Sequence, residues 1–202
     1  MLQYIISNWM DVLGTALGLL YLYLEMKENI WMWVVGCIMP LIYVFVLYDK
    51  GIYADCGMEV YYFLAGIYGF VYWLRGKSRK GTPVAISHTP RRLKSMLWVY
   101  ALVLWMVLGT ALDRLTDSTV PYTDGLSTAL SIIALWMLSR KYIEQWWVWL
   151  VVDLISTCLY IYKGIYGRAL LYGIYTAMAV YGYYVWRRRM TLQTADIMPK
   201  AQ

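Results

Sequence analysis

The sequence predicts an all-α membrane protein with seven transmembrane helices, built as two parallel three-helix repeats joined by a connector helix. Three observations predict this fold: an apolar composition, seven apolar runs of helical length, and an internal repeat without gaps. Hydrophobic residues make up 61% of the 202 residues and charged residues only 15%, with a mean hydropathy of +0.51. Because soluble domains are about half apolar and about a quarter charged, this composition indicates a chain that crosses a membrane several times.

The apolar runs define the expected elements in order. A spanning helix needs about 20 mostly apolar residues. The expected spans are 8–25, 31–48, 56–74, 95–112, 122–139, 145–162 and 168–186. A long basic loop separates the third span from the fourth. The predicted domains are therefore a first three-helix repeat at 8–75, a cytoplasmic basic loop with the connector helix at 76–121, a second three-helix repeat at 122–190, and a cytoplasmic tail at 191–202.

The positions of Lys and Arg predict the orientation of these spans. With the N-terminus outside, 14 of the 18 basic residues fall on the side that holds the basic loop and the C-terminus, and 4 fall on the other side. Cytoplasmic loops carry the excess of Lys and Arg in membrane proteins. We therefore expect a multi-pass membrane protein with its N-terminus outside and its C-terminus in the cytoplasm.

An internal repeat relates the two halves at an offset of 113 residues. Trp33 aligns with Trp146, and the segment 50–53 (Lys-Gly-Ile-Tyr) is identical to 163–166. Roughly 20 of about 65 aligned positions agree without a gap. Three spans plus one connector return the second repeat to the orientation of the first, so the repeats are expected to be parallel, as in some transporters that bind substrate between two halves.

Several functional classes lack their chemical parts. The single histidine, His88, lies in the charged loop, which disfavours histidine-based zinc sites and Ser-His catalysis in the membrane. Cys37, Cys56 and Cys158 form no CxxC motif. We therefore expect no catalytic residues, no metal and no cofactor, and a chain that is not an enzyme. The basic charge follows membrane topology, so we expect no nucleic-acid partner.

The span 145–162 carries the strongest functional signal. Asp153 lies at its centre, and a carboxylate at this depth is a functional candidate. Projected at 100° per residue, one arc of the helix holds the aromatic and polar residues Trp146, Trp149, Asp153, Ser156, Thr157 and Tyr160. Indoles beside a carboxylate suit a flat, cationic, aromatic ligand. The alternative is that the tryptophans anchor the helix at the interface while Asp153 contacts a neighbouring helix; for Trp147, which points away, we favour that interpretation.

Two further features leave their alternatives open. Glu59 lies about a turn inside the third span, where a functional role and a position near the interface fit equally well. Ser127, Thr128 and Ser131 form a polar stripe on the fifth span, which either faces a cavity or makes hydrogen bonds in helix packing.

The pattern Trp146-x-x-Trp149-x-x-x-Asp153 within seven spans resembles the PnuC family of bacterial vitamin transporters. The resemblance covers about 8–190. It implies a full-length SWEET-like fold, a homotrimer in the bacterial inner membrane, and uptake of nicotinamide riboside by facilitated diffusion, followed by phosphorylation by a cytoplasmic vitamin kinase. It also implies that Trp146, Trp149 and Asp153 line the substrate site, to which the helical face adds Ser156 and Tyr160. The expected partners are the vitamin and membrane lipid.

Asp153 leaves the identity of the vitamin open, since nicotinamide riboside transporters commonly have Asn there. A carboxylate offers hydrogen-bond acceptors only, which suits the amino group of thiamine better than a carboxamide. Thiamine uptake, as in the PnuT branch, is therefore the alternative to nicotinamide riboside uptake. A membrane interaction protein without transport activity is a more distant alternative.

Overall fold

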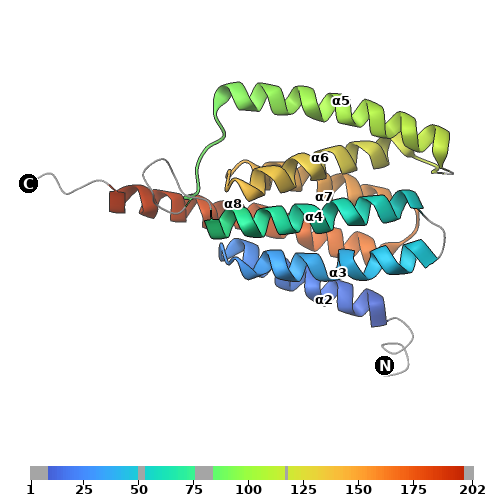
Figure 1. Ribbon diagram of the computed structural model, residues 1–202, viewed down its shortest axis with the longest axis horizontal. Coiled ribbons are helices and arrows are strands. Elements are labelled where there is room, and N and C mark those ends of the chain that lie inside the picture. The colour runs from blue at the N-terminus through green and yellow to red at the C-terminus, as the bar shows by residue number, and fades with distance from the viewer. Residues whose placement is uncertain (1–8, 50–52, 76–83, 117, 198–202) are drawn as a thin grey trace, which may run out of the picture. The chain divides into compact units, whose positions relative to one another are not determined.

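The computed structural model describes residues 9–49, 53–75, 84–116 and 118–197, and these form seven helices (Figure 1). The helices are α2 (Trp9–Met26), α3 (Trp31–Asp49), α4 (Tyr53–Arg75), α5 (Arg91–Leu115), α6 (Pro121–Ser139), α7 (Gln145–Tyr162) and α8 (Tyr166–Ile197). Each expected span falls on one of them, so the all-helical prediction is confirmed. Residue 8, the loop residues 76–83 and the tail residues 198–202 lie outside the described part of the chain.

Length and composition make α3, α5 and α7 able to cross a membrane, and α2 contains a shorter apolar stretch at Val12–Met26. Helices α4 and α8 contain many tyrosines and polar residues, as in Tyr-Tyr at 61–62 of α4 and at 183–184 of α8. The chain is a multi-pass membrane protein. The crossing of the membrane by all seven helices stays a prediction.

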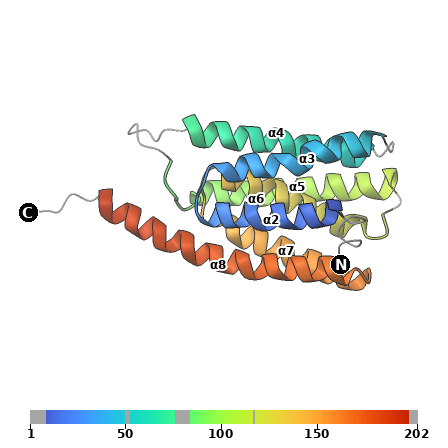
Figure 2. The ribbon, with the colours of Figure 1, turned by 90° about the horizontal axis from the view of Figure 1, so that it is seen from below.

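Helix α8 is longer than the span predicted for it. It has 32 residues and continues from Trp186 through three arginines to Ile197. At 1.5 Å per residue such a helix is about 48 Å long, which exceeds the hydrocarbon core of about 30 Å. No glycine or proline interrupts the sequence between 183 and 197, so the helix continues past the apolar run; Figure 2 shows this end reaching beyond α7.

Two compact units make up the chain, Met1–Pro83 and Val84–Gln202. In the first unit, α3 packs against both α2 and α4. In the second unit, α7 packs against both α6 and α8, and the connector α5 packs along α6 (Figure 1). The middle helix of each triplet thus contacts both of its neighbours.

A Trp-Gly-Trp contact holds the last two helices of each triplet together. In the first unit the rings of Trp33 and Trp73 meet edge to face, with centroids 5.7 Å apart, and Trp33 covers Gly69 so closely that a Cβ there would clash with the ring. Aromatic pairs in this geometry contribute about 0.5–1.5 kcal/mol beyond the area they bury. A small residue opposite a large ring is what allows α3 and α4 to approach each other.

The second unit repeats this contact at the offset of 113 residues. Trp146 meets Trp186 edge to face at 5.7 Å and covers Gly182 in the same way. The turns after the first helix of each triplet also correspond, because Glu28 (φ 55°) and Lys141 (φ 56°) adopt the same left-handed backbone conformation. The internal repeat of the sequence therefore appears as repeated local packing within each unit.

Candidate functional site

The burial of side chains along α7 follows the helical face expected from the sequence. Trp146, Asp153 and Ser156 are buried, whereas Trp147 and Val151 on the other side are exposed. An apolar outer face and a polar inner face is the arrangement that a membrane-embedded helix adopts when polar groups point into the protein.

Trp146 is a packing residue in this structure. Its ring is 1% exposed and lies between Gly182 and Trp186 of α8. Its indole Nε1 is buried and has no hydrogen-bond partner among the described residues. The equivalent Trp33 occupies the same kind of position in the first unit, so the shared role of this pair is to join two helices. Contact between Trp146 and substrate stays a prediction.

Trp149 lies on the side of α7 that meets the core of the second unit. This core is formed by α5, α6 and α7 through the buried residues Ala101, Leu130, Ile133, Met137 and Val152. The partly buried ring of Trp149 packs against these residues, and its Nε1 is buried with no hydrogen-bond partner in the described part of the chain. An unpaired buried donor costs about 1–3 kcal/mol, so this indole N–H is available for a ligand acceptor.

Asp153 is the central polar group of α7. Its side chain is 6% exposed, and its carboxylate has no hydrogen bond and no ion pair with any described residue. Ser156, one turn further along, is also buried. Burying an ionised carboxylate without a partner is costly, and a cationic ligand would remove that cost. Thr157 differs, since its hydroxyl donates to the backbone carbonyl of Asp153 at 2.7 Å within the helix.

Tyrosines of α8 surround the next turn of α7. The ring of Tyr160 stacks on Tyr172 with centroids 5.3 Å apart and an interplanar angle of 27°. Tyr172 in turn meets Tyr175 edge to face at 5.6 Å. Both Tyr172 and Tyr175 lie close enough to Asp153 to interact electrostatically with its carboxylate. The guanidinium of Arg168 lies 5.8 Å from the centroid of the Tyr160 ring, which is within the range of a cation–π interaction.

The structure therefore brings Asp153 and Tyr160 into one aromatic cluster with Tyr172 and Tyr175, which the sequence analysis missed. Tyr175 repeats Tyr62 at the internal offset, and this match was the only available signal. The two tyrosines are three residues apart and so share a face of α8. Tyr183 belongs elsewhere, since its ring contacts the exposed Trp147 at 4.9 Å.

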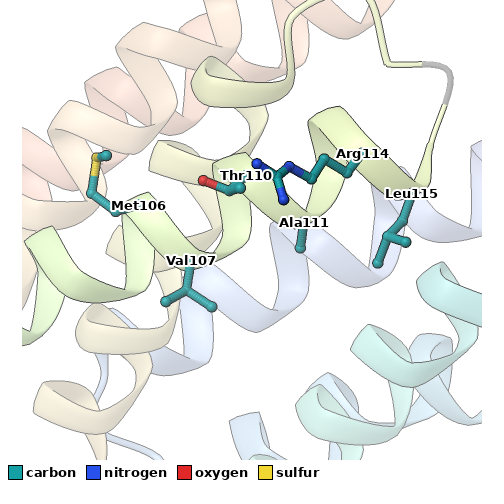
Figure 3. A pocket seen from close by; sticks show the side chains of 6 residues that line it. All are labelled: Met106, Val107, Thr110, Ala111, Arg114 and Leu115. Atoms are coloured by element: carbon teal, nitrogen blue, oxygen red, sulfur yellow. The ribbon is translucent and has the colours of Figure 1, made fainter.

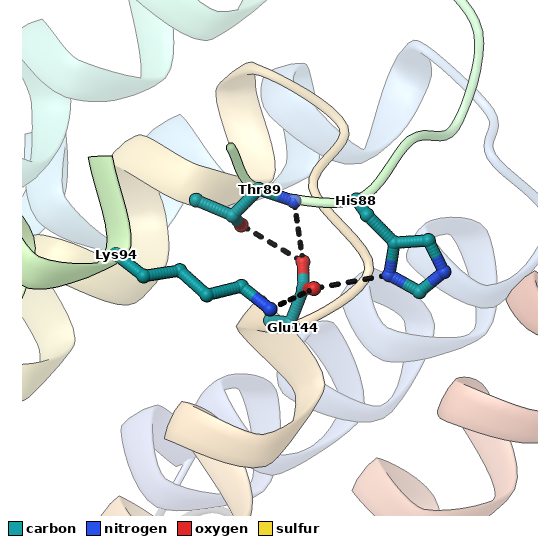
Figure 4. A network of polar contacts seen from close by, with 4 residues as sticks. All are labelled: His88, Thr89, Lys94 and Glu144. Atoms are coloured by element: carbon teal, nitrogen blue, oxygen red, sulfur yellow. Dashed lines mark hydrogen bonds and ion pairs between the residues drawn. The ribbon is translucent and has the colours of Figure 1, made fainter. Parts of the chain in front are cut away.

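The N-terminal end of α7 is held by a cluster of hydrogen bonds on Glu144 (Figure 4). The Glu144 carboxylate accepts from the backbone N–H and the hydroxyl of Thr89, both at 2.8 Å, and lies 2.8 Å from Lys94 Nζ and 3.0 Å from His88 Nδ1. Partial burial alone would raise the pKa of Glu144. The bonds from Lys94, Thr89 and His88 together outweigh burial and lower the pKa to about 2.

Backbone bonds reinforce this attachment of the segment before α5 to the turn between α6 and α7. The N–H of Ser87 donates to the carbonyl of Lys141 at 3.1 Å, and the N–H of Ile143 donates to the carbonyl of Ser87 at 3.0 Å. The N–H of Ile86 donates to Gln193 Oε1 of α8 at 3.2 Å. The start of α7, which positions Trp146 and Trp149, is therefore fixed to the segment before α5 and to the first turn of α5, and that segment is in turn bonded to α8.

Two other candidates do not join the cluster. Ser131 of the polar stripe on α6 donates to the carbonyl of Ser127 at 2.8 Å, within its own helix. A hollow of about 500 Å³ near the C-terminal end of α5 is lined by six residues, all from that helix: Met106, Val107, Thr110, Ala111, Arg114 and Leu115 (Figure 3). Because it has one wall and few polar groups, this hollow does not define a binding site.

In a protein of apolar, membrane-crossing helices, an unpaired buried carboxylate beside an aromatic cluster between α7 and α8 is a candidate binding site and points to a membrane transporter for a small organic molecule. Comparison with known proteins agrees. The profile of the nicotinamide mononucleotide transporter family matches residues 8–188, and the chain belongs to this family.

Individual relatives are more distant. The chain is similar to the nicotinamide riboside transporter PnuC of Escherichia coli (strain K12), with 26% identity over 89% of this chain and 85% of that protein. It is also similar to the riboflavin/roseoflavin transporter RibM of Streptomyces davaonensis, with 25% identity over 96% of this chain and 91% of that protein. The resemblance to PnuC seen in the sequence is confirmed.

A solved structure has a similar fold. The crystal structure of the vitamin B3 transporter PnuC superposes with a TM-score of 0.72 and covers 93% of this chain and 86% of that chain, at 23% identity. At this identity the likeness shows the fold, and it agrees with an all-helical membrane protein.

Proposed function

We propose that this protein takes up nicotinamide riboside across the bacterial inner membrane by facilitated diffusion. The observation that carries the proposal of a cationic, aromatic substrate is the buried, unpaired carboxylate of Asp153 beside the rings of Tyr160, Tyr172 and Tyr175. Nicotinamide riboside has a flat cationic ring, which aromatic faces and a carboxylate attract together. Family membership and the similarity to PnuC of Escherichia coli support the same substrate.

The arrangement of polar groups fits the rest of the ligand. The hydroxyl of Ser156 and the phenols of Tyr172 and Tyr175 can donate to or accept from a ribose or carboxamide. The indole N–H of Trp149 is a further donor without a partner among the described residues. Within this proposal the substrate-binding residues are Trp146, Trp149, Asp153, Ser156 and Tyr160, and the two tyrosines of α8 extend the site.

The mode of transport is also a proposal. Two parallel repeats in a 3+1+3, SWEET-like arrangement would alternate access by rocking against each other. Support comes from the Trp-Gly-Trp contact that recurs in both units. Asp153 lies beside the aromatic cluster of Tyr160, Tyr172 and Tyr175, and no second carboxylate pairs with it among the described residues, which favours uptake without ion coupling. A cytoplasmic kinase would then trap the vitamin.

Orientation and assembly complete the proposal. The excess of Lys and Arg on one side, 14 against 4, supports an N-terminus outside and a C-terminus in the cytoplasm. A homotrimer is proposed from the PnuC resemblance, and the long exposed apolar surface of α5, with Trp98, Val99 and Val103, offers area for contact with lipid or with another subunit.

Binding and uptake measurements test the proposal. Isothermal titration of the detergent-purified protein with nicotinamide riboside, thiamine and riboflavin should show preference for the first, and proteoliposomes should accumulate it only to equilibrium. Asp153→Asn keeps the shape of the side chain and removes the charge. If thiamine binds more tightly than nicotinamide riboside, the substrate assignment is wrong. If the folded protein binds none of the three and moves none, the transport proposal fails.

A further inference from the structure

A second pocket, separate from the Asp153 cluster, lies between α5, α6 and α7. It has a volume of about 220 Å³ and takes apolar walls from all three helices, including Ala101, Ile133 and Val148. Lys94 and Glu144 are the charged residues among those that line it. The pocket is therefore amphipathic, with apolar walls and a charged end at the start of α5 and α7.

Two tryptophans flank this pocket on its exposed side. Trp98 of α5 is 69% exposed and Trp147 of α7 is 49% exposed, and both line the pocket. Exposed tryptophans in membrane proteins concentrate at the level of the lipid headgroups. With 25 residues, α5 is about 37 Å long, long enough to cross the hydrocarbon core, so its charged first turn belongs at the membrane surface.

One face of α5 changes from basic to apolar along its length. Arg91, Lys94, Trp98 and Ala101 follow one another at intervals of three or four residues, so they share a face of the helix. Lys94 is paired with Glu144 at 2.8 Å. Arg91 is exposed and pairs with no carboxylate among the described residues. The negative charge of Glu144 is thus balanced locally, while the positive charge of Arg91 is not.

We propose that this pocket binds an acyl chain of an anionic phospholipid whose headgroup phosphate is bound by Arg91. Basic pockets between transmembrane helices are known places for anionic headgroups, and an arginine guanidinium matches phosphate oxygens in geometry as well as charge. The acyl chain packs against the walls that Ala101 and Ile133 provide, and Trp98 covers it at the level of the headgroup. The proposal depends on membrane insertion and not on which vitamin is transported.

Native mass spectrometry of the full-length, detergent-purified protein tests this site. Dioleoylphosphatidylglycerol and dioleoylphosphatidylcholine are titrated separately, and we expect the first to be retained preferentially. Arg91→Gln should lower the affinity for phosphatidylglycerol about fivefold, which is about 1 kcal/mol for one basic residue converted at 1.4 kcal/mol per factor of ten. The matched control is Arg188→Gln, which changes another exposed arginine, on α8, and should leave the affinity unchanged.

The apolar part of the site is tested separately. Trp98→Ala should lower retention of phosphatidylglycerol, while Trp31→Ala, which removes a 61% exposed tryptophan from α3, should not. Inorganic phosphate alone should not displace the lipid, because phosphate has no acyl chain to fill the pocket. For the same reason a short-chain phosphatidylglycerol should not bind. The proposal is overturned if Arg188→Gln weakens binding as much as Arg91→Gln, if phosphatidylcholine is retained equally, or if phosphate alone displaces the lipid. Melting temperatures of all variants establish that they are folded.

Discussion

Glu144→Gln should destabilise the second unit, because it removes the charge that holds the start of α7. In the wild type this carboxylate is 19% exposed and receives hydrogen bonds from Lys94, His88 and Thr89. Glutamine keeps the size of the side chain but cannot pair with the Lys94 ammonium in the same way. The expected consequence is a looser attachment of α7 to the segment before α5.

The magnitude follows from the pKa of Glu144, which is lowered from an ordinary 4.5 to about 2. At about 1.4 kcal/mol for each pKa unit, this lowering corresponds to about 3 kcal/mol. Solvent screening of a partly exposed group reduces the figure, and we expect a loss of about 2 kcal/mol at pH 7. In a protein of this size, such a loss lowers the melting temperature by roughly 4–8 °C.

The dependence on pH gives the measurement its specificity. Because the pKa is lower in the folded state, the stabilisation is complete above the ordinary pKa of 4.5 and is lost as the pH falls through about 2. The difference in melting temperature between wild type and Glu144→Gln, measured in detergent, should therefore fall to less than half between pH 7 and pH 3. Asp113→Asn is the control, an exposed carboxylate on α5. An equal difference at both pH values, or a variant as stable as the control, would refute the reasoning.

The remaining predictions concern helix packing, the site and the topology. Gly182→Ala should lower the free energy of unfolding by about 1–3 kcal/mol, because the added Cβ would meet the Trp146 ring. Gly173→Ala on the same helix has open space around it and should be neutral or slightly stabilising. Thermal melting compares the two variants, and equal melting temperatures would contradict the packing. Trp149→Ala and Asp153→Ala should each weaken vitamin binding by about 1–3 kcal/mol in titration calorimetry. Trp147 is exposed, and if Trp147→Ala weakens binding more than Trp149→Ala does, the wrong face of α7 was assigned. The topology is tested with single cysteines in a background without native cysteines. Thr119→Cys should react with an impermeant thiol reagent added outside whole cells, and Thr191→Cys should not. The reverse pattern would show that the proposed orientation is wrong.

The helices and the inner face of α7 were predictable from the sequence because they depend on local periodicity. Apolar runs of about 20 residues have few alternatives to a helix in a membrane. The 100° advance per residue places Trp146, Asp153 and Ser156 on one side, and the structure buries all three. The register of the internal repeat was equally predictable, and it recurs in the contacts of Trp33 and Trp146 with their glycines.

Contacts between distant segments were decided by the tertiary structure alone. Glu144 and His88 are 56 residues apart, and only the docking of the segment before α5 brings them within 3.0 Å. Tyr172 belongs to the Asp153 cluster because α8 packs on α7 with a particular rotation about its own axis, and periodicity within α8 does not determine that rotation. Local sequence determines which face of a helix is apolar, whereas the facing of one helix toward another depends on how their side chains interlock.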